Sequence, residues 1–295
     1  MLYWLVMSRS TIAVTGATGA LGSRVAARLA EHGAHQLVLG HHLAQLPELP
    51  GAEPRGDAVY DDEEAMQAAL AGADTLVLVS SRPTGRRLEE HAAAVEAGRA
   101  VGVQRVIFVS LVGAAPTATY RNARDHWLTE QYLAGCGLRY TVVRAGIYAS
   151  TLTRLADDSL VIRGPGGDGR TAFTTHRDIA AVIATLAEDA GNDHDSAVLQ
   201  ATGPEPLTLA ETAARLATST GRRFRYQDES VEDAFIWRWQ QGMSGTQIES
   251  WISWYLAIAA DELDFVSADV QRITGVAAEP VDRAEWWPEP VRKLP

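Results

Sequence analysis

Short runs of β-branched and aliphatic residues alternate with amphipathic stretches through the first half of the chain. The apolar runs are expected to be buried strands, at residues 11–15, 37–40, 75–80, 105–110 and 140–144. The stretches between them carry apolar residues at helical spacing and predict helices, at residues 21–32, 61–70, 88–101 and 122–134. Residues 43–55 carry three prolines and are expected to form a loop. Because strands that alternate with helices are typical of parallel βαβ units, the pattern predicts an α/β fold with a doubly wound parallel sheet.

The pattern changes after about residue 150. The glycine-rich segment 164–169 interrupts two short extended pieces. A Ser or Thr followed by an acid three residues later predicts three helix N-termini, at Thr175 with Asp178, Thr208 with Glu211, and Ser230 with Asp233. Residues 197–202 are expected to return to the main sheet as an extra strand. We therefore expect a sheet domain over residues 8–150, rejoined by 176–202, and a smaller C-terminal lobe over 151–175 and 203–295.

Composition narrows the set of partners and compartments. The chain has 295 residues, and 37 acidic against 26 basic residues give it a net charge of −11. So acidic a surface repels phosphate backbones and anionic lipid, which argues against nucleic-acid and membrane partners. The opening apolar run, Met1 to Met7, is far shorter than the ~20 residues of a membrane span. The single cysteine, Cys136, matches no metal-binding spacing and cannot form an intrachain disulfide. No metal and a reducing, cytoplasmic location are therefore expected, and the oligomeric state is left open.

The strongest local motif is TGATGALG, which begins at Thr15 between a predicted strand and a predicted helix. Gly16 permits a tight turn, Gly19 lets the backbone approach a pyrophosphate, and Gly22 allows the helix to pack closely on the strand. The free N–H groups and the positive dipole end of the helix then face the phosphates. In this context the motif predicts a Rossmann-type dinucleotide site rather than a mere turn, and the residues of that site are Gly16, Ala17, Thr18, Gly19, Ala20, Leu21 and Gly22.

The end of the second predicted strand indicates which dinucleotide is bound. An NAD site usually has Asp or Glu there to hold the ribose 2′-OH, and no residue between positions 36 and 47 is acidic. The strand ends instead in a glycine followed by His41 and His42, which favours NADP(H) over NAD(H), with an imidazole at the 2′-phosphate. The alternative is that both histidines are solvent-exposed loop residues. Asp57 is a candidate for the adenine edge or, alternatively, for a helix N-terminal cap.

With these motifs the chain resembles the NmrA-like branch of atypical short-chain dehydrogenases. The resemblance spans residues 11–285 and rests on TGATGALG, LVSS, FVSL, LRYTVVRAGIY, and GDGRTAFTTHRDIAAVIA with PEPLTLAE. It implies a Rossmann sheet that binds NADP(H), a C-terminal substrate lobe, and reduction of quinones or similar conjugated aromatics, as in bacterial NAD(P)H:quinone oxidoreductases and triphenylmethane reductases. It also implies the position of the cofactor: the pyrophosphate at Gly16 to Gly22, the nicotinamide-side ribose near Ser80 and Ser81, and the nicotinamide beside Ala145, Gly146 and Ile147. The branch usually has Arg where this chain has His41.

Ordinary short-chain dehydrogenases protonate a carbonyl with Tyr-x-x-x-Lys, and the chain has no such pair. Its only lysine is Lys293, and we interpret the spacing of Tyr120 to Arg124 as coincidental. The resemblance implies that His126 takes the position of the lysine and touches the nicotinamide ribose, unless it is an ordinary polar helix residue. Asn122 then takes the position of the tyrosine. The missing pair favours acceptors with an extended π-system, for which stacking and proximity carry hydride transfer.

Two hydroxyls and an aromatic stripe are further candidates for the substrate site. Ser110 ends a predicted strand and Tyr148 follows one, and both are candidate proton donors, although a strand-end hydrogen bond and a packed ring are equally compatible roles. Trp251, Trp254 and Tyr255 are spaced i, i+3 and i+4, and form either a core stripe or an aromatic wall for a flat substrate. The predicted function is NAD(P)H-dependent reduction of a conjugated carbonyl or quinone-like compound. The alternatives are an NADP-binding redox sensor without catalysis, and a biosynthetic epimerase, dehydratase or cyclase on the same fold.

Overall fold

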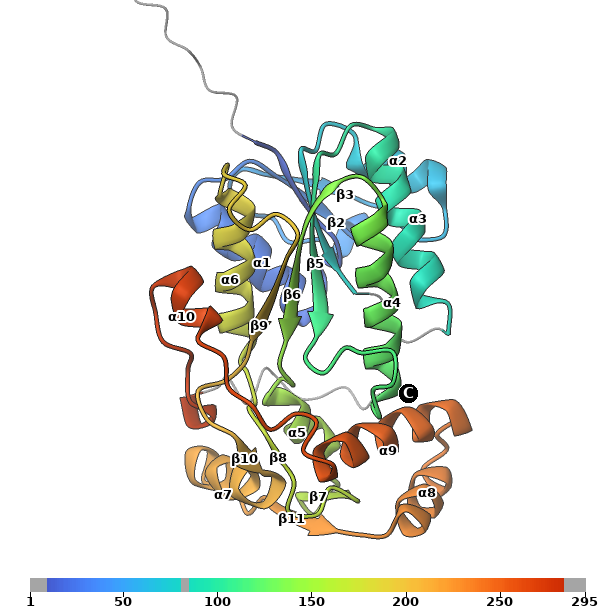
Figure 1. Cartoon of the computed structure of the whole chain (residues 1–295), viewed down its shortest axis with the longest axis vertical. Helices are drawn as coiled ribbons and strands as arrows, with labels where there is room; N and C mark the ends of the chain where they lie inside the picture. Colours follow the sequence, from blue (N-terminus) through green and yellow to red (C-terminus); the bar gives the residue numbers. More distant parts are fainter. Residues whose placement is uncertain (1–9, 81–84, 284–295) are drawn as a thin grey trace, which may run out of the picture. The chain divides into compact units, whose positions relative to one another are not determined.

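A seven-stranded sheet is the largest element of the computed structural model, which describes residues 10–80 and 85–283 (Figure 1). Its strand order is β3-β2-β1-β4-β5-β6-β9, and the pairs from β3 to β5 run parallel. The chain builds outward from β1 in one direction and then restarts at β4 in the other, which is the topology of a doubly wound sheet. The predicted α/β fold of the Rossmann type is therefore confirmed, as is the extra strand near residue 200.

The elements around and within this sheet have the following bounds. The strands are β1 (Ile12–Val14), β2 (Gln36–Leu39), β3 (Ala52–Arg55), β4 (Thr75–Val79), β5 (Arg105–Leu111), β6 (Arg139–Ala145) and β9 (Ala197–Ala201). The helices that connect them are α1 (Ala20–Glu31), the 3₁₀ turn η1 (Leu43–Gln45), α2 (Glu63–Leu70), α3 (Arg87–Ala100), α4 (Arg121–Gly135) and α6 (His176–Glu188). The other elements are α5 (Ser150–Leu155), β7 (Val161–Gly164), β8 (Arg170–Thr171), β10 (Leu207–Thr208), α7 (Leu209–Thr220), β11 (Arg225–Asp228), α8 (Val231–Gln240), α9 (Gly245–Ala259), α10 (Asp269–Thr274) and η2 (Val281–Arg283).

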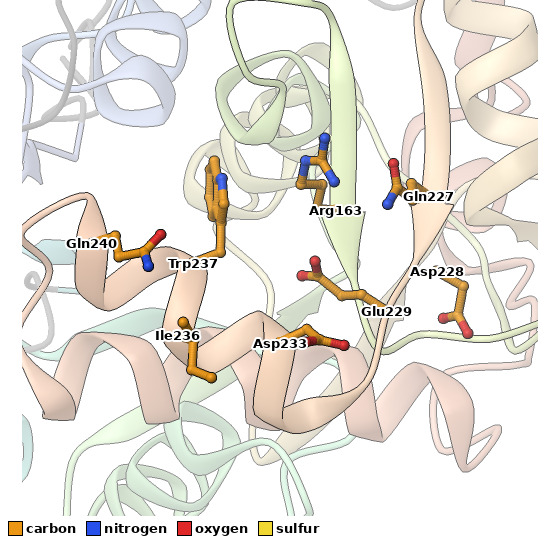
Figure 2. Close-up of a pocket in the computed structure, with 8 residues that line it drawn as sticks. All are labelled: Arg163, Gln227, Asp228, Glu229, Asp233, Ile236, Trp237 and Gln240. Atoms are coloured by element: carbon orange, nitrogen blue, oxygen red, sulfur yellow. The ribbon is translucent and has the colours of Figure 1, made fainter.

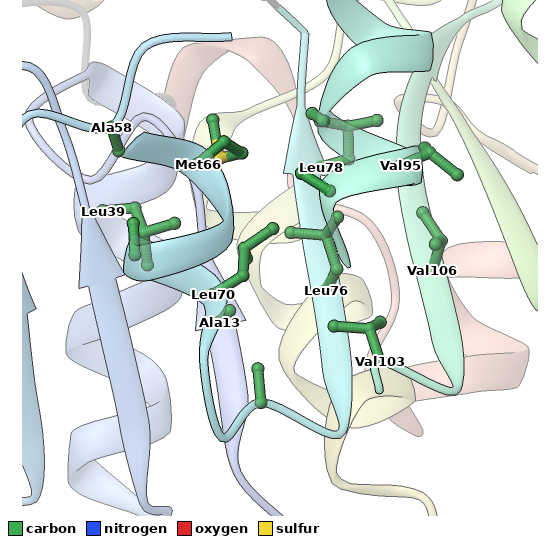
Figure 3. Packing of buried hydrophobic residues seen from close by; sticks show 14 of the residues in the cluster. Ala13, Leu39, Ala58, Met66, Leu70, Leu76, Leu78, Val95, Val103 and Val106 are labelled. Atoms are coloured by element: carbon green, nitrogen blue, oxygen red, sulfur yellow. The ribbon is translucent and has the colours of Figure 1, made fainter. Parts of the chain in front are cut away.

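The chain divides into two compact units. Among the described residues, unit 1 comprises 10–80, 85–109, 129–142 and 180–198, and unit 2 comprises 110–128, 143–179 and 199–283. Side chains of unit 1 alternate between the two faces of the sheet, and both faces are buried, as a parallel sheet requires. Leu37 and Leu39 of β2 belong to the cluster beneath α2 and α3, which Figure 3 shows, whereas Val38 packs with Ala26 of α1 on the other face.

Unit 2 has its own core, built around two small sheets. β7 pairs with β11 in parallel, and β8 pairs with β10 antiparallel. The core cluster joins residues of α7, α9 and the strands, among them Phe173, Leu209, Trp254, Tyr255 and Ile258. The second half of the chain therefore contributes a hydrophobic core of its own.

Side-chain caps start the helices of unit 2 where the sequence predicts them. The hydroxyl of Thr175 accepts from the N–H of Asp178 (3.0 Å), that of Ser230 accepts from Asp233 (3.0 Å), and Thr208 forms a reciprocal box with Glu211. All three predicted helix starts are confirmed. A fourth side-chain cap, the reciprocal box of Ser244 with Gln247, starts α9 and was missed because its partner is an amide rather than an acid.

The prediction of a loop at residues 43–55 is confirmed for residues 46–51 and wrong for the rest. These residues include η1 and the strand β3, which pairs with β2 at the edge of the sheet. Pro54 is compatible with this position, because an edge strand has a neighbour on one side only and can dispense with an N–H on the other. The opening apolar run from Met1 to Met7 and the lone lysine, Lys293, lie outside the described residues.

Candidate functional site

The loop between β1 and α1, in unit 1, presents main-chain N–H groups at a helix start. Gly16 has φ +62°, a left-handed backbone conformation that residues with a side chain rarely adopt. Its carbonyl accepts a hydrogen bond from the N–H of Gly19 (2.8 Å). A Cβ on Gly22 would lie 2.3 Å from that carbonyl oxygen, so only glycine allows α1 to start this close to the loop. No side chain caps α1, and its first turn carries no acid. This geometry fits a pyrophosphate, because the first N–H groups of a helix bind anions when no side chain satisfies them.

Tyr60, which sequence reasoning missed, joins this loop to the end of β4. Its hydroxyl donates to the carbonyl of Val79 (2.7 Å) and lies 2.9 Å from the hydroxyl oxygen of Thr15, the residue before the loop. The Thr15 hydroxyl in turn accepts from the N–H of Val79 (2.9 Å). Burial raises the pKa of Tyr60 to about 12, so the phenol stays protonated and can donate at any physiological pH. No spacing rule connects Tyr60 with a loop 45 residues earlier in the chain.

The residues predicted to read the adenosine half of the cofactor are accessible. His41 and His42 are both exposed after β2, which leaves both of their predicted roles open. Asp57 is exposed and has φ +56°. The alternative that Asp57 caps a helix is wrong, because the N-cap of α2 is Asp62, whose carboxylate accepts from the N–H of Ala65 (3.0 Å). Ser80 is half-buried after β4, and Ser81 lies outside the described residues.

The end of β6, in unit 2, carries the residues predicted to lie beside the nicotinamide. Ala145, Gly146 and Ile147 are buried. Each is fixed by a main-chain hydrogen bond to a different segment: the carbonyl of Ala145 accepts from Val112 (3.0 Å), the N–H of Gly146 donates to Ala201 (2.9 Å), and the carbonyl of Ile147 accepts from Thr174 (2.9 Å). A Cβ on Gly146 would lie 3.0 Å from the carbonyl oxygen of Ala172, so the strand end has little room for a larger residue.

Tyr148 stacks on a histidine that sequence reasoning did not single out. The rings of Tyr148 and His176 are parallel within 1°, with centroids 4.0 Å apart. Ser150 Oγ lies 3.4 Å from Nδ1 of the same histidine. Burial raises the pKa of Tyr148, so its phenol holds its proton tightly. Ser110, the other predicted hydroxyl, is fully buried at the end of β5.

A chain of hydrogen bonds links the residues around Tyr120. The amide of Asn122 donates to the phenol oxygen of Tyr120 (2.9 Å), and the hydroxyl of Ser250, on α9, donates to the amide oxygen of Asn122 (3.3 Å). Arg124 does not face the tyrosine: its Nε donates to the carbonyl of Ala118 (2.5 Å). The interpretation of the Tyr120 to Arg124 spacing as coincidental therefore agrees with the position of the guanidinium.

Three of the remaining candidates, His126, Trp254 and Tyr255, are buried, whereas Trp251 is half-buried. His126 on α4 is 3% exposed. Trp254 is 1% exposed and Tyr255 is fully buried, and both belong to the core of unit 2. The structure therefore favours the core stripe over the aromatic wall for Trp254. Trp251 is half-buried and meets Trp254 edge to face, with ring centroids 6.1 Å apart, so Trp251 is the residue of this pair with accessible surface.

A pocket of about 380 Å³ in unit 2 contains none of the predicted site residues. It lies between β7, β11 and α8, and it is lined by Arg163, Gln227, Asp228, Glu229, Asp233, Ile236, Trp237 and Gln240 (Figure 2). Its most buried charges are paired within the fold, since Glu229 accepts from Arg238 (3.1 Å) and Arg163 donates to Asp157 (3.2 Å). The pocket therefore shows no feature that selects a ligand.

The described residues were also compared with the requirements of a metal site and of a membrane-spanning helix. Within residues 10–80 and 85–283, no three His, Cys, Asp or Glu side chains are placed to hold a metal ion. Over the same ranges, no helix has the length and apolar character that a bilayer span needs. Cys136 is a free, half-buried thiol whose Sγ donates to the carbonyl of Leu133 (3.2 Å).

Known proteins have related sequences and structures. A family described as NAD(P)H-binding matches residues 16–190. Quinone oxidoreductase 2 of Escherichia coli (strain K12) is 35% identical over 229 residues, which cover 75% of this chain and 79% of that protein. The crystal structure of an NADPH-dependent quinone oxidoreductase, QOR2, from Escherichia coli in complex with NADPH has a TM-score of 0.83 at 29% identity, covering 92% of this chain and 97% of that one. The structure of triphenylmethane reductase from Citrobacter sp. has a TM-score of 0.80 at 25% identity, covering 92% and 96%.

Proposed function

We propose that this chain, which belongs to the NAD(P)H-binding, NmrA-like family of oxidoreductases, reduces quinone-like or other conjugated acceptors by direct hydride transfer. The observation that carries the proposal is the uncapped start of α1 behind a loop in which Gly16 has a positive φ and Gly22 leaves no room for a Cβ. Relatives named for the reduction of quinones and of triphenylmethane dyes support the acceptor class. Both acceptor types are conjugated: a quinone spreads the negative charge of an added hydride over its ring and oxygens, and a cationic triphenylmethane dye is neutralised by it.

The residues proposed to hold the cofactor are those that the sequence motifs and the family resemblance imply. Residues 16–22 would bind the pyrophosphate, His41 the 2′-phosphate, and Asp57 the adenine edge. Ser80 and His126 would contact the nicotinamide-side ribose, and residues 145–147 would lie beside the nicotinamide. NADPH held in this way supplies the hydride. The protein's own contribution is to orient the acceptor, for which Tyr148 and Trp251 are the proposed contacts.

We further propose that the reaction proceeds without a Tyr-Lys pair. The only lysine in the sequence is Lys293, and Arg124 is turned toward Ala118 rather than toward Tyr120. Stacking and proximity then provide most of the rate enhancement, and a hydroxyl group of the protein or water completes the protonation.

The deciding experiment measures NADPH and NADH oxidation at 340 nm against quinones, azo and triphenylmethane dyes, enones and simple ketones. We expect turnover with the conjugated acceptors and little or none with simple ketones. NADPH binding without turnover of any acceptor would contradict the enzyme and favour the redox-sensor alternative. Turnover of simple ketones at the same rate would contradict the proposed acceptor class.

Preference for NADPH over NADH is the finer part of the proposal and rests on His41. His41→Asp should weaken NADPH binding and leave NADH binding unchanged or improved, because a carboxylate repels the 2′-phosphate and accepts from a ribose 2′-OH. His35→Asp is the matched control, since His35 is also an exposed histidine beside β2. If the ratio of the two dissociation constants is the same in both variants and in the parent, His41 has no role in cofactor choice.

A further inference from the structure

The segment that carries Tyr120 is fastened to α9 and the residues just beyond it within unit 2. The N–H of Thr119 donates to Glu262 (3.0 Å), and the N–H of Arg121 donates to the hydroxyl of Ser253 (3.2 Å). The guanidinium of Arg121 forms an ion pair with Glu249. Tyr120 is half-buried between these anchor points, so its ring is held in place while part of its surface stays accessible.

The amide of Asn122 is oriented by α9. Because the Ser250 hydroxyl donates to the amide oxygen, the NH₂ group of Asn122 is the side that faces Tyr120. Its nitrogen lies 2.9 Å from the phenol oxygen. The phenol oxygen of Tyr120 thus accepts a hydrogen bond from a neutral donor whose orientation is set by the Ser250 hydroxyl.

An N–H directed at a phenol oxygen favours release of the phenolic proton. The hydrogen bond to a charged oxygen is stronger than the same bond to a neutral one, so the donor stabilises the phenolate more than the phenol. Tyr148, the other tyrosine of unit 2 considered above, has a histidine ring against its face, and burial raises its pKa. Of the two tyrosines, Tyr120 therefore has the surroundings of a proton donor.

We propose that Tyr120 is the proton donor of the reduction, and that Asn122 and Ser250 are positioning residues that hold its oxygen for this step. The proposal rests on the proposed function. Reduction adds a hydride from NADPH to the acceptor and leaves a negative charge on an acceptor oxygen. The O–H bond of Tyr120 then breaks as an O–H bond forms at that oxygen, and the phenolate regains a proton from solvent. NADPH is oxidised, and the acceptor is reduced by two electrons and gains two hydrogens.

Single-turnover reduction of a quinone tests the proposal, with Tyr140→Phe as the matched control. Tyr140 lies on β6 and has no part in the hydrogen-bond chain. Tyr120→Phe should slow reduction about a hundredfold, at the lower end for loss of a general acid because the acceptor spreads its charge. Asn122→Asp, which replaces the donor with an acceptor, should slow it about tenfold, and Ser250→Ala should slow it less. The solvent isotope effect of the parent should disappear or change in Tyr120→Phe and Asn122→Asp, and stay unchanged in Tyr140→Phe.

A spectroscopic readout is independent of turnover. With the quinone bound beside NADP⁺, an O–H donated by Tyr120 should lower the quinone carbonyl stretching frequency in infrared difference spectra. The shift should be absent in Tyr120→Phe and retained in Tyr140→Phe. Equal carbonyl frequencies and equal rates in these two variants would overturn the role of Tyr120 and leave the proposed function intact.

Failure of the proposed function has a different result, because the parent itself would then bind no NADPH or reduce no conjugated acceptor. If Tyr120→Phe does not fold, Asn122→Asp and Ser250→Ala decide the question. Parental rates, isotope effects and carbonyl frequencies in both of those variants would contradict the proposal.

Discussion

Alanine at Gly19 and alanine at Gly22 should affect different properties of the protein, because the two added methyl groups meet different surroundings. At Gly22 the new Cβ would lie 2.3 Å from the carbonyl oxygen of Gly16 and 2.9 Å from that of Thr15. Both are main-chain atoms of a strand end and a tight turn, so neither can swing away. At Gly19 the nearest atom is the same Gly16 oxygen at 3.2 Å, and the backbone has φ −88° and ψ 170°, which any residue adopts.

These distances set the expected magnitudes. Gly22→Ala should lower the free energy of unfolding by about 3 kcal/mol or more, at the upper end for overpacking, because backbone must move. Gly19→Ala should change it by less than about 1 kcal/mol, since a small shift relieves the contact and alanine reduces the entropy of the unfolded chain. Its methyl group nevertheless stands at the exposed start of α1, where the phosphates are proposed to bind. Loss of one charge-assisted hydrogen bond there corresponds to a Kd for NADPH about tenfold higher.

Urea denaturation of the ligand-free protein measures the first effect, and fluorescence titration with NADPH measures the second. Gly135→Ala is the matched control, because a Cβ at Gly135 on α4 meets no atom within 4 Å. It should leave the Kd unchanged and raise the free energy of unfolding by no more than about 1 kcal/mol. A Gly19→Ala protein with the parent's stability and the parent's Kd would refute the placement of the pyrophosphate at this loop. A Gly22→Ala protein as stable as the parent would refute the close approach of α1.

Two further predictions concern buried groups of unit 1. Tyr60→Phe removes the hydroxyl that joins Val79 to Thr15. In urea denaturation it should lower the free energy of unfolding by about 1–2 kcal/mol. In steady-state kinetics it should raise the KM for NADPH while kcat stays near the parent's value. An unchanged KM would mean that the loop does not depend on Tyr60. Burial, with a smaller contribution from Arg87, lowers the pKa of His91 to about 3. Between about pH 6.5 and pH 3 the unfolded chain therefore binds a proton at this site that the folded protein does not, and stability should fall by about 1.4 kcal/mol per pH unit as the pH decreases. His91→Gln should remove this slope from urea denaturation curves measured between pH 4 and pH 7, and the same slope in the variant would assign it to other groups.

Local periodicity was sufficient to predict the sheet and most of its helices, because each of these elements is encoded within its own residues. Leu37, Val38 and Leu39 alternate between two buried faces, which is why the run is uniformly apolar. Thr208 and Glu211 specify a helix start across four consecutive residues. β3 escaped detection because its sequence, AEPR, is half exposed and contains a proline. Pairing with β2 at the sheet edge, a non-local interaction, makes it a strand.

In the candidate site, too, local features could be predicted from the sequence and contacts between distant residues could not. The loop before α1 was predictable because the tight turn, the close contact of α1 with that turn and the start of the helix all lie between Gly16 and Gly22. The contacts that support the site were not, because their partners are far apart in sequence. Tyr60 reaches Thr15 across 45 residues, and Ser250 reaches Asn122 across 128. No pattern read along the chain connects such pairs.

The absence of a sequence motif is consequently a weak guide to the absence of the chemistry that the motif supplies. Tyr-x-x-x-Lys is a local rule, because residues four apart on a helix share a face and the ammonium can act on the phenol. In this chain Arg124 stands at that spacing from Tyr120 and turns to the carbonyl of Ala118 instead. The hydrogen bond to the phenol oxygen comes from Asn122, two residues away, and the orientation of that amide is set by α9. A neutral donor stabilises a phenolate less than a cation does, and an acceptor that spreads its own charge requires less stabilisation. The weaker support for Tyr120 therefore matches the conjugated acceptors proposed for this protein, and it is unsuited to a simple ketone.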